Sequence, residues 1–127
     1  MADPKDEAQR IIHLMALCAL ADGDIDPREA EAIPRIAEEH GLLRVLGEVH
    51  IEQAFLDRVD ELGVPALVRE LAAGLIAPRA RQEAIACVGE VVVADEELND
   101  RELVVIELLQ KEFGITNESV RRLLVPK

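Results

Sequence analysis

Two short stretches of this sequence gather carboxylate side chains at matching spacing. The first holds Asp22, Asp24 and Glu29, and the second holds Asp95, Glu97 and Glu102. Hard divalent cations take six or more oxygen ligands, and alternating acids followed by an acid in the next helix's first turn supply several of them. Like charges held this closely also repel each other unless a counter-ion is present. Both stretches are therefore candidate cation sites, for Ca²⁺ first and for Mg²⁺, Mn²⁺ or Zn²⁺ as alternatives.

The first stretch begins like the loop of an EF-hand, with Asp22, Asp24 and Asp26 at alternate positions. An EF-hand loop needs glycine at its sixth position and a bidentate glutamate at its twelfth. Here these positions hold Pro27 and Ile33. The sequence therefore excludes an EF-hand.

Helix capping also explains several of these side chains. Asp26 and Asn99 suit N-cap positions, while Glu29 and Glu102 suit the capping-box position that the helix dipole favours. The first acid of each stretch would then simply begin a turn. Spacing alone leaves cation binding and capping both open.

The two acidic stretches belong to an internal repeat. A shift of 73 positions lays residues 21–41 over residues 94–114, with many conservative replacements and seven identical pairs. The identical pairs are Ala21/Ala94, Asp22/Asp95, Arg28/Arg101, Glu29/Glu102, Ile33/Ile106, Glu39/Glu112 and Gly41/Gly114. This offset is longer than a solenoid period, so it predicts two copies of one helix-loop-helix hairpin. Packing about an approximate twofold axis would bring both acidic loops to one side of the bundle.

Apolar periodicity and helix-end signals predict a compact all-α bundle of about seven helices around the two hairpins. Val91, Val92 and Val93 alone favour a strand, but their alignment with the first helix predicts a helix. A short helical turn is also possible within residues 42–49. The predicted helices span residues 4–21, 27–40, 51–62, 65–75, 78–93, 100–113 and 117–124.

Composition limits the partners of this protein. The 127 residues are half hydrophobic, which fits a single domain over residues 1–127. A net charge of −12 disfavours nucleic acid and anionic membranes and attracts cations or a basic partner protein. The same charge also suits a protein that is acidic merely to remain soluble.

The cysteines and the apolar stretches indicate a cytoplasmic protein. Cys18 and Cys87 each lie in an apolar run without a CxxC motif, which predicts buried free thiols. No stretch has the length of a signal peptide or a membrane-spanning helix. We therefore expect no membrane insertion.

The acidic stretches resemble the paired motif of the TerB family, which is named for bacterial tellurite resistance. The motif Ala-Asp-Gly-x-Ile-x-x-x-Glu matches residues 21–29, and residues 94–102 repeat it as Ala-Asp-Glu-Glu-Leu-Asn-Asp-Arg-Glu. The resemblance implies a seven-helix stress-response or signalling domain with a divalent-cation site, and no established enzymatic activity. Carried over, it nominates Asp22, Asp24 and Glu29, and then Asp95, Glu97 and Glu102. The second copy has Glu96 where the motif has glycine, so that loop either differs in shape or gains a ligand.

Three functions follow from these observations. The first is a cation-binding TerB-like module that acts through unidentified partner proteins, and the second is a metal-independent helical interaction domain. Metal-assisted hydrolysis by the same carboxylates is a weaker third. His13, His40 and His50 have no neighbouring nucleophile that suggests a triad, so no catalytic residue is predicted.

Overall fold

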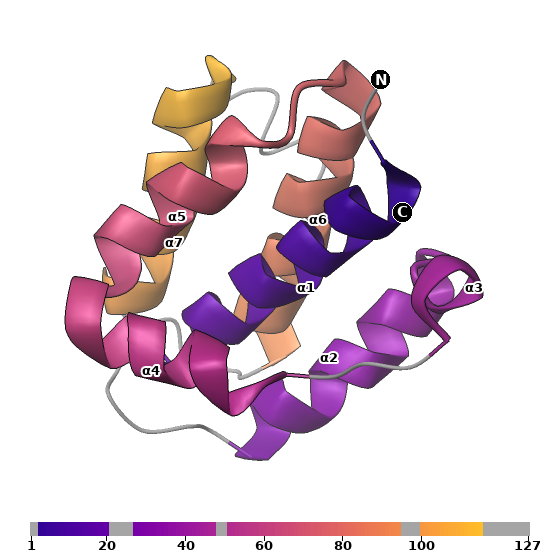
Figure 1. Ribbon diagram of the computed structural model, residues 1–127, viewed down its shortest axis with the longest axis horizontal. Coiled ribbons are helices and arrows are strands. Elements are labelled where there is room, and N and C mark those ends of the chain that lie inside the picture. Colours follow the sequence, from indigo (N-terminus) through magenta and orange to yellow (C-terminus); the bar gives the residue numbers. More distant parts are fainter. Residues whose placement is uncertain (1–2, 21–26, 48–50, 95–99, 116–127) are drawn as a thin grey trace.

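The computed structural model is an all-α bundle (Figure 1). It describes residues 3–20, 27–47, 51–94 and 100–115, of which residues 27–30, 93–94 and 100–103 are described by their backbone alone. Within these ranges the chain forms seven helices and no strand, which confirms the predicted fold class. They are α1 (Pro4–Leu20), α2 (Pro27–Glu39), α3 (Leu43–Leu46), α4 (Gln53–Leu62), α5 (Val64–Ala73), α6 (Pro78–Ala94) and α7 (Asp100–Phe113).

Most helix boundaries agree with the sequence prediction to within two residues. The short turn expected within residues 42–49 exists as α3, and the valine run 91–93 is helical, since α6 continues to Ala94. The last predicted helix, residues 117–124, lies outside the described residues. At the start of α1, Asp3 Oδ1 accepts a hydrogen bond from the Lys5 N–H at 3.0 Å, so Asp3 is the N-cap of this helix.

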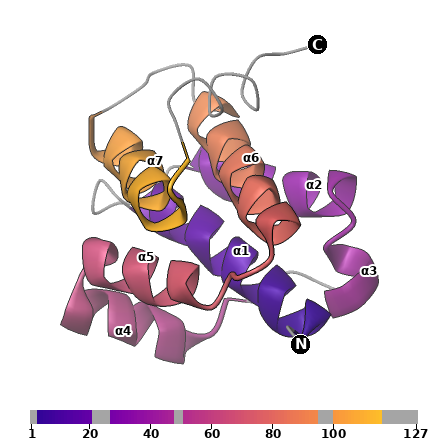
Figure 2. The same cartoon turned by 90° about the horizontal axis from the view of Figure 1, so that it is seen from above.

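The two long helices α1 and α6 form the centre of the bundle. From Ile11 to Ala19, all but one residue of α1 is buried, so this helix is enclosed on nearly every side. It packs most extensively against α6, whose Ile85, Val88 and Val91 are fully buried. In Figure 2, α4 and α5 lie on one flank of α1, and α2 and α3 lie on the other.

The two hairpins depart from strict twofold packing. The second helix of the first hairpin, α2, packs mainly on α6, but its counterpart α7 packs mainly on α5 rather than on α1. The connecting helix α5 contacts both α1 and α7, and α7 contacts α1 less than α2 contacts α6. The predicted twofold axis is therefore only a rough description of this bundle.

The helices α2 and α7 end in the same way. Gly41 and Gly114 follow them at φ of 76° and 66°, in the left-handed region that glycine adopts without strain. In each case the next residue closes the turn, with Leu42 N–H donating to Ala37 O at 2.9 Å and Ile115 N–H to Gln110 O at 3.0 Å. These bonds satisfy carbonyls that the helix end leaves free, as in a Schellman motif.

Arg10 of α1 ties the end of α5 to the centre of the bundle. Its Nη1 donates to the carbonyls of Glu70 and Leu71, at 3.2 Å each, and its Nε donates to Asp6 at 2.8 Å. The guanidinium lies directly against Gly74, where a Cβ would be only 2.1 Å from Arg10 Cζ. Because Gly74 has no side chain, the Arg10 guanidinium has room to bind the last carbonyls of α5.

Candidate functional site

Most of the predicted cation ligands lie where the structure gives no description. Asp22, Asp24, Asp95 and Glu97 fall outside the described residues. Glu29 and Glu102 are each the third residue of their helix, α2 and α7, and only their backbone is described. Among the described side chains, no group of three or more histidines, cysteines and acids is arranged to hold a metal ion. Cation binding by the acidic stretches therefore stays a prediction.

The helices that flank these stretches are duplicated as the sequence predicts. Helices α2 and α7 begin 73 residues apart, at Pro27 and Asp100, and α1 and α6 have the same length of 17 residues. The repeat extends into the first helix of each hairpin, because residues at this offset are buried in both copies. Such buried pairs are Ile12/Ile85, Met15/Val88, Cys18/Val91, Ile33/Ile106 and Ile36/Leu109.

The described helix ends next to the two acidic stretches lie on one side of the molecule. In Figure 1, the C-terminal ends of α1 and α6 and the N-terminal ends of α2 and α7 all lie in the lower part of the view. A helix C-terminus carries partial negative charge and favours a cation, while an N-terminus favours an acid in its first turn. Glu29 and Glu102 are acids in the first turn of their helices, where the N-terminal partial positive charge favours them.

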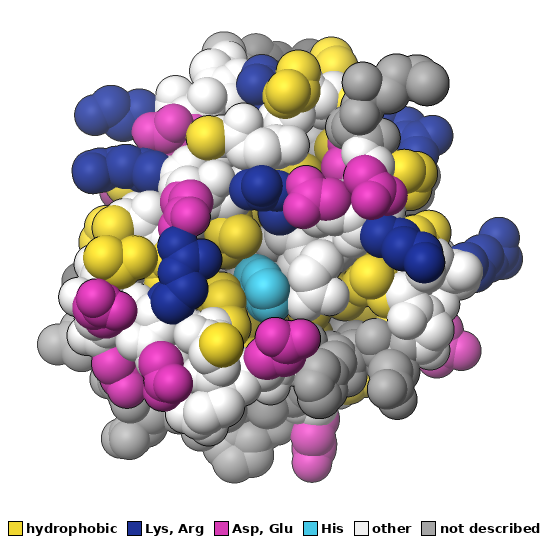
Figure 3. Space-filling view, in the orientation of Figure 1, with side chains coloured by type: hydrophobic (Ala, Val, Ile, Leu, Met, Phe, Trp, Pro, Cys, Tyr) yellow, Lys and Arg dark blue, Asp and Glu magenta, His cyan; other side chains and the backbone are white. Residues whose placement is uncertain are grey.

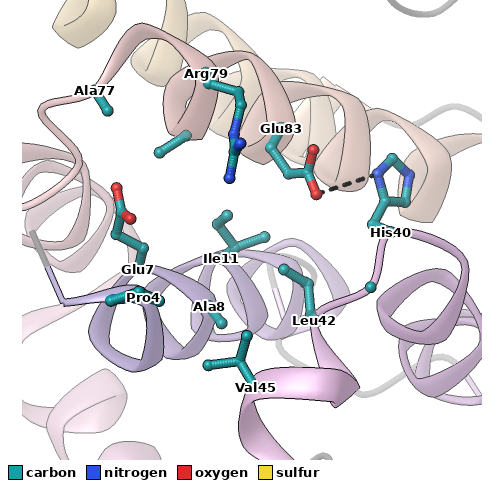
Figure 4. A pocket seen from close by; sticks show the side chains of 12 residues that line it. Pro4, Glu7, Ala8, Ile11, His40, Leu42, Val45, Ala77, Arg79 and Glu83 are labelled. Carbon is teal, nitrogen blue, oxygen red and sulfur yellow. Dashed lines mark ion pairs between the residues drawn. The ribbon is translucent and has the colours of Figure 1, made fainter.

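A pocket of about 230 Å³ opens between the first turns of α1, the end of α2 with α3, and the first turns of α6 (Figure 4). Its apolar wall consists of Pro4, Ala8, Ile11, Leu42, Val45, Ala77 and Ala80. Its polar lining consists of Glu7, His40, Arg79 and Glu83. In Figure 4, Arg79 reaches from α6 into the space between Glu7 and Glu83. This is a concave site with a small number of charged groups on an apolar wall, as ligand pockets commonly are.

The polar groups of this pocket are unevenly paired. Glu83 lies 3.7 Å from His40 Nδ1, while His40 Nε2 is 2.5 Å from Glu90. Glu83 and Glu90 are seven residues apart on α6 and so share the face toward His40. By contrast, Glu7 Oε2 is shielded from solvent and has no hydrogen-bond partner, and Arg79 forms no ion pair with any described residue.

The other described histidine, His13, lies in a largely apolar setting. Its ring stacks on Phe55 with the centroids 4.1 Å apart, and its Nε2 is 2.8 Å from the Gln9 side-chain nitrogen. Burial lowers the pKa of His13 below its usual value; Arg58 and Arg10 add to this effect, and the carboxylate of Glu52 opposes it. This environment favours a neutral ring in the folded protein.

The two cysteines are core residues. Cys18 and Cys87 are fully buried and form no disulfide, which confirms the prediction of buried free thiols. Burial raises the pKa of the Cys87 thiol, and the nearby carboxylates of Glu83 and Glu90 raise it further. A thiol in this state is a poor nucleophile.

The described surface mixes charges of both signs. On the face shown in Figure 3, acidic and basic side chains alternate, with apolar side chains between them. The segments 22–29 and 95–102 carry nine acidic and two basic residues, which gives −7 of the net charge of −12. More than half of the net negative charge therefore belongs to the two repeated stretches.

No family model matches this sequence, and no curated protein matches it. The fold is similar to the crystal structure of a protein of unknown function from Porphyromonas gingivalis W83, with a TM-score of 0.52 and 19% sequence identity over 97% of each chain. At this identity the likeness shows a common fold alone. In the part of the chain that the structure describes, no helix is long and apolar enough to cross a membrane.

The pocket is the feature that sequence reasoning missed. In the sequence His40 was considered only as a possible member of a triad, and Glu7 and Arg79 are ordinary first-turn residues of their helices. The pocket combines side chains from three segments far apart in the chain. No local pattern marks such a combination, because it depends on how α1, α3 and α6 pack.

Proposed function

We propose that this protein is a TerB-like, cytoplasmic stress-response module that binds a divalent cation, Ca²⁺ foremost, through its two acidic interhelical stretches. The ligands would be Asp22, Asp24, Glu29, Asp95, Glu97 and Glu102. The module acts through partner proteins rather than as an enzyme. The observation that carries the proposal is the duplicated hairpin, whose two acidic stretches follow helices that end on the same side of the bundle.

Electrostatics supports this proposal. Sixteen residues hold a net charge of −7, and the two stretches leave the C-terminal ends of α1 and α6, where the helix dipoles add partial negative charge. Concentrated negative charge of this kind attracts cations, and a bound cation reduces the repulsion between the carboxylates. The proposal covers two separate ions as well as one ion shared by both stretches.

Calorimetric titration of metal-free protein with Ca²⁺, Mg²⁺, Mn²⁺ and Zn²⁺ tests the proposal. We expect at least one ion to bind more tightly than millimolar, and the double variant Asp22→Asn with Asp95→Asn to weaken that binding at least tenfold. The stoichiometry separates a shared site from two sites. A matched control is Asp60→Asn with Glu61→Gln, which removes the same charge from exposed positions on α4. Equal effects of the two double variants, or no binding tighter than millimolar, would disprove the proposed site.

The second candidate function is a metal-independent helical interaction domain. The net charge of −12 favours it, because an acidic surface attracts a basic partner without any metal. Co-precipitation with Ca²⁺ or with a chelator distinguishes the two functions. A partner that is retained equally under both conditions supports the metal-independent domain, and one that is lost on chelation supports the cation-binding module.

A further inference from the structure

The pocket between α1, α3 and α6 holds two unpaired opposite charges that do not neutralise each other. Glu7 belongs to the first turn of α1 and Arg79 to the first turn of α6, and no ion pair joins them. One oxygen of the Glu7 carboxylate is buried without a hydrogen-bond partner. A buried polar atom without a partner is costly, so this carboxylate is better accommodated when a cationic donor occupies the pocket.

The remaining acid of the pocket is already engaged. Glu83 faces His40 on the side of the pocket away from Glu7, as Figure 4 shows. Glu7 is thus the acid available to a ligand's positive group, and Arg79 is the base available to a negative group. The two side chains point into the same space from opposite helices.

The size and the walls of the pocket restrict the ligand further. Its 230 Å³ is below the roughly 300–1,000 Å³ of pockets that hold drug-sized molecules, and equals the liquid volume of roughly eight water molecules. Ile11, Leu42 and Val45 give it an aliphatic wall on the side of α1 and α3. A fitting ligand is small and has an ammonium group, a carboxylate and a short aliphatic chain.

We propose that this pocket binds a small aliphatic α-amino acid. Glu7 faces the ligand's ammonium group, Arg79 faces its carboxylate, and the side chain contacts the wall of Ile11, Leu42 and Val45. The acidic stretches take no part in this binding, so it persists in the presence of a metal chelator. It is therefore independent of the cation-binding function proposed above.

Titration of the full chain with L-leucine in a chelating buffer tests this proposal by calorimetry and by amide chemical shifts. We expect millimolar or tighter binding, with shifts at pocket residues such as Ala8, Gly41 and Ala80. Leucinamide lacks the carboxylate and N-acetyl-leucine lacks the ammonium group, so each should bind about tenfold more weakly. No shift at these residues, or equal binding of all three compounds, would overturn the proposal.

Variants assign the two charges separately. Arg79→Gln should weaken leucine about tenfold and leave leucinamide unchanged, and Glu7→Gln should weaken leucine and leave N-acetyl-leucine unchanged. Arg69→Gln and Glu31→Gln are matched controls on exposed positions outside the pocket, and both should bind leucine as the parent protein does. Arg79 is exposed, so Arg79→Gln is expected to fold, and it tests the proposal even if Glu7→Gln does not fold. Equal losses from Arg79→Gln and Arg69→Gln would refute the assigned contact.

Discussion

Replacement of Gly74 by alanine tests how α1 holds the end of α5. The new Cβ would lie 2.1 Å from Arg10 Cζ and 2.3 Å from Nη1, so the guanidinium would have to leave. It would then lose its hydrogen bonds to the carbonyls of Glu70 and Leu71. The side chain of Arg10 is flexible, so the backbone itself can stay in place.

The expected magnitude comes from two opposing effects. Hydrogen bonds from a charged donor contribute about 1.5–3 kcal/mol, and the lower end applies here because the bonds are long, at 3.2 Å, and the Arg10 side chain is 28% exposed. Gly74 has φ −84° and ψ −8°, a conformation in which alanine is favoured by about 0.4–1 kcal/mol. Two such bonds are lost, so the net effect of Gly74→Ala is a loss of about 2 kcal/mol of stability.

The same substitution should change sign once Arg10 is absent. In an Arg10→Ala background no guanidinium opposes the Cβ, so Gly74→Ala should stabilise the protein by about 0.4–1 kcal/mol. Urea unfolding followed by circular dichroism measures all four proteins, since the chain has no Trp or Tyr for fluorescence. Ala66→Gly, at an exposed position of α5, should have equal effects in both backgrounds. If Gly74→Ala changed the free energy of unfolding in the same direction in both backgrounds, the close contact between Gly74 and Arg10 would be refuted.

Three further predictions concern single residues. Because the pKa of His13 in the folded protein is lowered from 6.5, the free energy of unfolding should decrease as the pH drops below about 6.5, by at most about 1.4 kcal/mol per pH unit. His13→Phe should remove this part of the pH dependence. A constant difference between the two proteins in urea unfolding from about pH 7.5 to about pH 5 would contradict the prediction. Cys87 is buried and its thiol pKa is raised, so iodoacetamide should modify it at least about 100-fold faster in urea than in native buffer. Mass spectrometry measures the two rates, and equal rates would contradict the prediction. Pro34 lies exposed inside α2, so Pro34→Ala should stabilise the protein by roughly 1–3 kcal/mol, whereas Glu107→Ala at the equivalent position of α7 should change stability by less than about 0.5 kcal/mol.

The valine run 91–93 shows why the sequence was informative about the fold. Local preference favoured a strand, but the repeat placed these residues in register with the first helix, and α6 includes them. A pattern that occurs twice predicts structure better than a single copy, because residues at matching positions of the two copies are expected to pack in the same way. The helix ends beside Asp3 and Gly41 were predicted to within one residue for a different reason, since capping depends on local backbone geometry.

Features that depend on packing between distant segments were not predictable. Leu62 is an apolar residue of α4, yet it is 49% exposed at the end of that helix. Nothing in the repeat indicated that α7 would pack mainly on α5 rather than on α1. The pocket at Glu7 and Arg79 depends on the same long-range packing. The six predicted cation ligands are a different case, because their side chains lie outside the described residues.

The duplication also argues that the two acidic stretches are not equivalent. Segment 22–29 has a net charge of −3 and contains Gly23, whereas segment 95–102 has a net charge of −4 and carries Glu96 at that position. Glycine adopts left-handed conformations freely and glutamate does not, so the two stretches differ in the backbone shapes open to them as well as in charge. If both bind ions, affinity should differ between them, since ligand charge and rigidity tune cation affinity. Calorimetry of Asp22→Asn and of Asp95→Asn separately should then remove different binding steps, and identical residual isotherms would show instead that both stretches serve one shared ion.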